Sequence, residues 1–159
     1  MGLMAKLFGQ TEPNHPELDA GSDAARRLKE HLEPLNRLAD EFKGERMELV
    51  PSEQGGYVFV GNPPKQFALA WIEDGAVRHF KALVDEGNIS PMLLEKLVEK
   101  LTEAYDVSKE APRFKASIGE HTVVVVPDAT LETNVRRLID EVNATVRRKK
   151  EKAAATGDH

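Results

Sequence analysis

The chain has 159 residues, a length that fits one domain, and its 40% hydrophobic and 31% charged content is that of an ordinary globular protein. It contains no cysteine, which excludes disulfides, thiolate nucleophiles and cysteine-ligated metal sites. The net charge of −5 argues against a general polyanion-binding protein, although residues 136–152 hold seven Lys or Arg residues against three acids.

The first elements are a leader and a helix. We expect residues 1–21 to form an irregular leader, because residues 9–21 include two prolines and little apolar content. A helix should follow, capped by Ser22 or Asp23, because a short side-chain oxygen accepts hydrogen bonds from the free amides of the first turn. Apolar residues recur at helical spacing over residues 28–42. Pro34 lies inside this pattern and lacks an amide hydrogen, so the helix either kinks there or restarts with Pro34 in its first turn.

The hydrophobic period then changes to that of strands. Residues 47–50 are expected to form a short strand with Glu48 facing outward, and residues 57–60 form a run of high β propensity. Residues 67–72 are apolar throughout, which is typical of a central strand. A tight turn should then return the chain into a strand over residues 77–83.

The rest of the chain adds a helix, a hairpin and a last helix. A serine and a proline open an amphipathic helix over residues 90–105. Residues 113–118 and 122–126 are expected to pair as a hairpin. The last helix should begin near Thr130 and fray into the basic segment 147–152.

The element order is therefore α-β-β-β-(β)-α-β-β-α. Short hairpin connections favour antiparallel pairing, and grouped helices and strands favour an α+β fold. We predict a two-layer α+β sandwich, with a mostly antiparallel twisted sheet of five or six strands and three helices mainly on one face. The single domain should span residues 22–146, followed by a basic C-terminal tail over residues 147–159.

The sequence offers little that points to catalysis. It contains no P-loop, dinucleotide-binding, nucleophile-elbow or zinc-protease motif, so we assign no catalytic, cofactor-binding or metal-ligating residue and do not expect an enzyme. His79 and His121 are the histidines within expected β structure. An enzyme or ligand sensor with a pocket near them remains an alternative.

Two sets of residues are candidates for binding partners. The aromatic residues of the first hairpin either fill the core or, if their strand is partly exposed, form a peptide groove; they are Tyr57, Phe59 and Trp71. The apolar face of the helix over residues 90–105 is a candidate dimer interface, through Leu94, Leu97, Val98, Leu101 and Tyr105. An open sheet edge is the other route that we expect to a homodimer.

The order of elements over about residues 23–146 resembles that of the class I type III secretion chaperones and the related YbjN-like proteins. The resemblance implies a homodimer of two-layer domains that binds partner polypeptides on apolar grooves and has no catalytic residues. The irregular leader and the basic tail depart from that pattern.

These observations lead to one preferred function. We expect a cytoplasmic, non-enzymatic protein-binding module, chaperone-like or regulatory, that acts as a homodimer without a cofactor. No apolar run approaches the roughly 20 residues of a membrane span, so a membrane partner is not expected. Nucleic-acid binding through the basic C-terminal helix is a second alternative that the acidic remainder of the chain disfavours.

Overall fold

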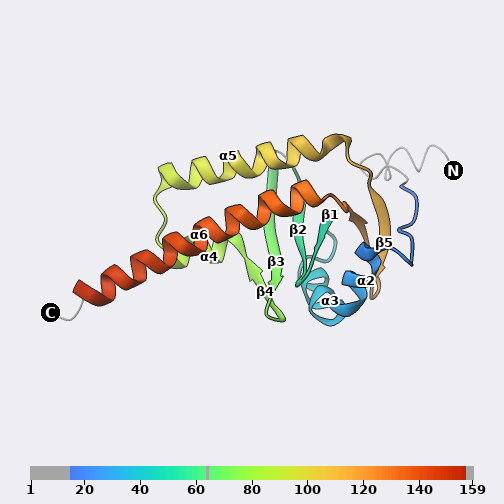
Figure 1. Ribbon diagram of the computed structural model, residues 1–159, viewed down its shortest axis with the longest axis horizontal. Helices are drawn as coiled ribbons and strands as arrows, with labels where there is room; N and C mark the ends of the chain where they lie inside the picture. The colour runs from blue at the N-terminus through green and yellow to red at the C-terminus, as the bar shows by residue number, and fades with distance from the viewer. Residues whose placement is uncertain (1–14, 64, 157–159) are drawn as a thin grey trace.

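The computed structural model describes residues 15–63 and 65–156. Figure 1 shows one twisted sheet with helices packed against it and a long C-terminal helix that extends beyond the sheet. Most of the predicted leader, residues 1–14, lies outside the described residues.

The sheet has six strands in the order β4-β3-β2-β1-β6-β5. Neighbouring strands are antiparallel, except for β1 and β6, which pair in parallel. The predicted α+β sandwich with a mostly antiparallel sheet is therefore confirmed. The strands are β1 (Met47–Ser52), β2 (Gly55–Asn62), β3 (Gln66–Glu73), β4 (Ala76–His79), β5 (Phe114–Ile118) and β6 (His121–Val125).

The helices cover both faces of the sheet instead of lying mainly on one. One face is covered by α2 (Asp23–Glu30) and α3 (Leu32–Glu41), which are the two parts of the predicted kinked helix. The other face is covered by α4 (Phe80–Glu86), α5 (Pro91–Val107) and α6 (Ala129–Thr156).

Local signals place two of the helix starts as expected. The Ser22 hydroxyl accepts a hydrogen bond from the Ala25 amide at 3.2 Å, and the Ser90 hydroxyl accepts one from the Leu93 amide at 3.3 Å. Pro34 lies in the first turn of α3, where its missing amide hydrogen costs no helical bond.

Alternation along β2 and β3 divides the core into two clusters. Val58, Val60 and Ile72 face α2 and α3, whereas Phe59 and Trp71 face the three helices on the other side. Because both faces are covered, the central strands are apolar on both sides, as predicted for residues 67–72.

Three local predictions are wrong. The strand expected over residues 77–83 ends at His79, because Phe80, Leu83 and Val84 are spaced to bury one side of a helix. Glu48 points into the core, where it is only 1% exposed. The last helix does not fray at residue 147 but continues to Thr156.

The outer edge of β5 is partly covered by the end of the leader. The Leu18 amide donates to the Lys115 carbonyl, and the Lys115 amide donates to the Pro16 carbonyl, both at 2.9 Å. This part of the leader is therefore more regular than predicted, since Glu17 and Lys115 form an isolated parallel bridge.

Candidate functional site

One half of β3 has a strand on one side only. On one side β3 pairs with β2, from Gln66 opposite Asn62 to Trp71 opposite Tyr57. On its other side, β4 pairs only with the second half, beginning at Ala70 opposite His79. Among the described residues, Gln66–Leu69 therefore form an open sheet edge, which we call the open half of β3.

The early end of β4 creates this open edge. After His79 the chain turns into α4, which buries Phe80, Leu83 and Val84 against one face of the sheet. A longer β4 would have paired with the first half of β3 and become the outer strand along its whole length. The helical spacing of those three apolar residues was the sequence signal for the early end of β4. The partial alternation of apolar and polar residues over 77–83 favoured a strand instead.

A hollow of about 530 Å³ lies beside the open half of β3. It is bounded by the end of α3, the first half of β3, the end of β4, α4 and the middle of α5. Ala68 is exposed there and Phe67 is partly buried. Most of the lining is apolar: Phe42, Phe67, Ala68, Leu69, Phe80, Ala82, Val98 and Leu101. A hollow of this size and composition suits apolar side chains of a ligand.

The polar groups of the hollow lie around this apolar lining. His79 Nε2 contacts Glu41 Oε2, and the Phe42 ring meets the imidazole edge-on, with 5.9 Å between ring centroids. Lys81 and Asp85 of α4 complete the polar lining. These residues include no hydroxyl or thiol that could act as a nucleophile. The polar groups of the hollow could therefore exchange a proton, through His79, or form ion pairs with a ligand, through Lys81 and Asp85.

The second predicted histidine lies elsewhere. His121, at the start of β6, contacts Asp40 Oδ1 through Nε2 at 2.6 Å, and it does not line the hollow. Since Asp40 and Glu41 are consecutive, the two histidines hold the end of α3 from two different strands. The structure therefore brings His79, but not His121, to a pocket.

The predicted binding residues are mostly in the core. Tyr57, Phe59 and Trp71 are buried within one chain, so they pack the fold rather than line an open groove. Of the predicted dimer residues, Leu97, Leu101 and Tyr105 are also buried, Leu94 is partly buried and Val98 is 40% exposed. The outward face of α5 thus keeps little of the apolar surface that the sequence suggested.

The most deeply buried charge is Glu48, in β1. Its Oε2 accepts a hydrogen bond from the Tyr105 hydroxyl at 2.5 Å, and its Oε1 accepts one from Arg113 Nε at 2.9 Å. Arg113 also donates to the Ser108 carbonyl at 2.8 Å, and its guanidinium lies 5.6 Å from the centre of the Tyr105 ring. This cluster joins β1 to the end of α5, and none of the described hollows reaches Glu48. We therefore assign it a structural role.

Both tyrosines have a perturbed phenol. Burial, followed by the hydrogen bond to Glu48, raises the pKa of Tyr105 to about 12. Burial also raises the pKa of Tyr57 to about 12. Neither phenol ionises near neutral pH, so neither is suited to act as a base there.

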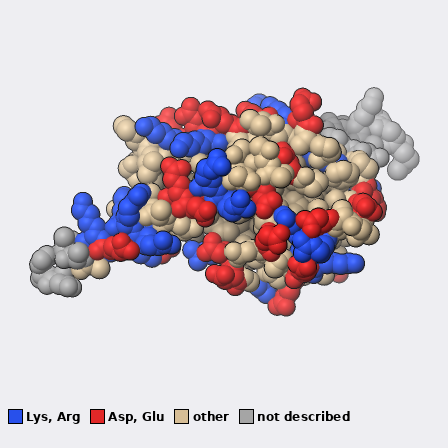
Figure 2. Space-filling view, in the orientation of Figure 1, with Lys and Arg blue, Asp and Glu red and all other residues tan. Residues whose placement is uncertain are grey.

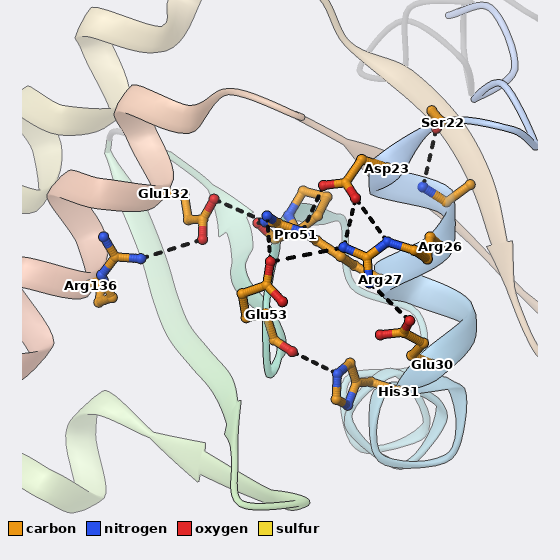
Figure 3. A network of polar contacts seen from close by, with 11 residues as sticks. Ser22, Asp23, Arg26, Arg27, Glu30, His31, Pro51, Glu53, Glu132 and Arg136 are labelled. Atoms are coloured by element: carbon orange, nitrogen blue, oxygen red, sulfur yellow. Dashed lines mark hydrogen bonds and ion pairs between the residues drawn. The ribbon is translucent and has the colours of Figure 1, made fainter.

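A second polar network holds the opposite ends of the chain together (Figure 3). Arg27 of α2 forms ion pairs with Asp23 at 3.0 Å, Glu53 at 2.8 Å and Glu132 at 3.1 Å. Glu132 also lies 3.5 Å from Arg136, one turn further along α6. Cations and carboxylates alternate in this network. It therefore ties α2 and α6 to the turn between β1 and β2.

The described residues form neither a metal-binding cluster nor a membrane-spanning helix. Among residues 15–63 and 65–156, no three acidic or histidine side chains are grouped as a metal site would require. No described helix combines the length and the apolar content needed to span a bilayer.

Comparison with known proteins finds no relative of this chain. The chain matches no known family, no curated protein and no solved structure.

Proposed function

We propose that the protein is a non-enzymatic protein-binding module, chaperone-like or regulatory, that binds an extended segment of a partner polypeptide at the open half of β3. The observation that supports this proposal is the position of the apolar hollow, which lies directly beside the unpaired strand edge.

An extended segment suits both features of this site. Another strand is the natural partner for an unpaired sheet edge, because the backbone groups of the two strands satisfy each other. Alternate side chains of the added strand point to opposite faces, so every second one could enter the hollow. The small side chain of Ala68 leaves space on that edge.

The proposal also draws on the order of elements along the chain. This order is similar to that of the class I type III secretion chaperones, which bind partner polypeptides on apolar grooves. The hollow at β3 takes the place of the groove that the sequence suggested around Tyr57, Phe59 and Trp71.

The proposal can be tested by selecting binding peptides from a random library displayed on phage. We expect enrichment of peptides with apolar residues at alternate positions. Ala68→Glu should abolish their binding, because it places a charge at the hollow. Ala76→Glu, on an exposed alanine of β4, is the matched control and should leave binding unchanged.

A second readout locates the bound peptide. Amide hydrogen exchange at Gln66–Leu69 should slow when the selected peptide binds, since strand pairing protects backbone amides. Peptides that bind the Ala68→Glu protein as well as the wild type would contradict the proposal, and so would a library without enrichment.

A ligand sensor or enzyme at the same hollow is the second candidate. The contact between His79 and Glu41 at the lining favours it, because a histidine paired with a carboxylate can exchange protons. This alternative would be supported by a small molecule that binds the protein without any partner peptide and no longer binds the His79→Gln variant.

A further inference from the structure

The end of α6 forms a basic projection. Val146 is the last residue of the helix that is buried in the core, and residues 147–152 contain five cations and one glutamate. This segment carries a charge of +4, which leaves −9 for the rest of the chain because the whole chain carries −5. Figure 2 shows Lys and Arg side chains gathered on the end of the helix that extends from the body.

A second hollow, of about 460 Å³, lies where this projection leaves the body. Lys149, Lys150 and Lys152 line it together with the end of α4. Lys149 Nζ donates to the Asn88 carbonyl at 2.8 Å, and Lys150 pairs with Glu86. The same lysine holds the pKa of the Glu86 carboxyl below its usual range. One of the lysines that line this hollow, Lys150, therefore already forms an ion pair with a carboxylate of the chain itself.

The basic hollow and the apolar hollow adjoin along α4. Asp85 lines the apolar hollow, and the next residue, Glu86, lines the basic one. The seven residues of α4 span only about 10 Å. A chain that leaves the open half of β3 could therefore reach the lysines within a few extended residues.

We propose that the partner segment bound at the open half of β3 continues into a short run of acidic residues, which the basic segment 147–152 binds. The inference rests on the proposed function and specifies the chemistry of the partner. Charge complementarity is its physical basis: Lys150 already pairs with the chain's own Glu86, and Arg147 and Arg148 are exposed.

An acidic peptide fits the surface better than other anions. A long nucleic acid would extend over the body, whose charge of −9 repels it, whereas a few carboxylates meet only the local charge of +4. The segment contains no aromatic side chain to stack on bases. It also contains no large apolar residue after Val146 that could enter a bilayer.

The experiment compares two synthetic peptides by fluorescence anisotropy with the full-length protein. Both share a strand-forming segment of alternating valine and threonine; one ends in a run of glutamates and the other in a run of serines. We expect the glutamate peptide to bind about tenfold more tightly at low salt, and the advantage to shrink as salt is added. Glu86→Gln should strengthen its binding further, because it removes a competing carboxylate.

Charge variants identify the surface. Arg147→Glu with Arg148→Glu should remove the advantage of the glutamate peptide and leave the serine peptide unaffected. Lys29→Glu with Lys109→Glu changes the net charge equally at two exposed cations of the body, and it should leave the advantage intact. Ala68→Glu should weaken both peptides, which separates the strand site from the basic segment.

Each other outcome overturns the inference in a distinct way. Equal binding of the two peptides would refute the inference that the partner carries an acidic run, but it would not contradict the proposed function. If neither peptide binds, both proposals fail. A DNA duplex that binds the same cations more tightly than the glutamate peptide, with no effect of Ala68→Glu, would assign the projection to nucleic acid.

Discussion

Glu48 is the second residue of a central strand and is almost fully buried, where an unpaired carboxylate would be costly. It is tolerated because its two oxygens accept hydrogen bonds from Tyr105 and Arg113. These partners come from the end of α5 and from the segment before β5, so the cluster fixes how both lie on the sheet. The sequence pattern gave no sign of this, because a polar residue between apolar neighbours in a strand usually faces solvent.

The first prediction concerns this buried pair. Glu48→Ala should lower the free energy of unfolding by about 3–5 kcal/mol, because Arg113 loses its carboxylate partner while only 12% exposed. Glu48→Leu combined with Arg113→Met should cost far less than the sum of the single changes, since it removes both charges. Denaturant unfolding of the wild type, Glu48→Leu, Arg113→Met and the double variant measures the coupling. Additive effects would show that the pair does not act as a unit.

The second prediction concerns alkaline stability. Below about pH 10 the tyrosines are protonated in both the folded and the unfolded chain, and stability does not depend on them. Between there and about pH 12, where Tyr57 and Tyr105 ionise in the folded state, the unfolded chain releases protons that the folded chain retains. Stability should therefore fall over this range, by on the order of 2 kcal/mol for each tyrosine.

Denaturant unfolding at a series of alkaline pH values measures this loss. Tyr57→Phe should reduce the slope of stability against pH, because phenylalanine cannot ionise. If the unfolding free energy of Tyr57→Phe fell as steeply as that of the wild type, Tyr57 would not be a source of the alkaline loss.

At the scale of elements, close packing fixes where α6 leaves the body. Gly87 follows α4, and a side chain there would place its Cβ only 2.3 Å from Val146 Cγ2. The loop and the helix can approach this closely because glycine has no Cβ. The contact also positions the lysines that follow Val146 beside Glu86.

The third prediction tests that contact. Gly87→Ala should lower the free energy of unfolding by about 1–3 kcal/mol, because valine has few alternative rotamers with which to avoid the methyl group. Val146→Ala removes the methyl groups that would clash with a Cβ at position 87. The variant with both Gly87→Ala and Val146→Ala should therefore lose less unfolding free energy than the sum of the two single losses. Thermal or denaturant unfolding provides the measurement. A neutral Gly87→Ala would mean that α6 shifts freely at this point.

At the scale of the whole molecule, the sheet has one edge partly covered by the leader and another that is open over Gln66–Leu69. An open edge with an apolar hollow is a surface that either a partner or a second copy could cover. The buried positions of Leu97, Leu101 and Tyr105 leave this edge as the stronger of the two predicted dimer routes.

The fourth prediction is the homodimer. Light scattering after size exclusion at two concentrations should give about twice the 17.7 kDa subunit mass. If the interface is the open half of β3, Ala68→Glu should give a monomer and Ala76→Glu should not, and a bound partner peptide should dissociate the dimer because both occupy the same strand edge. A monomer in the wild type at both concentrations would rule out the predicted dimer and leave the edge for a partner.

The sequence by itself determined the type and order of most elements, because capping serines, prolines and hydrophobic periods act over a few residues. The α+β class and the break near Pro34 were predictable on that basis. The central position expected for residues 67–72 holds only for the second half of β3, because its first half forms an open edge.

Only the tertiary structure decided which surfaces are buried and which are open. Whether Glu48 faces the core depends on Arg113, 65 residues away, and the parallel pairing of β1 with β6 depends on the path through α5. The length of β4 depends on where Phe80 can be buried. The candidate site follows from these long-range contacts, and the helical spacing of Phe80, Leu83 and Val84 is the local pattern that indicates the early end of β4.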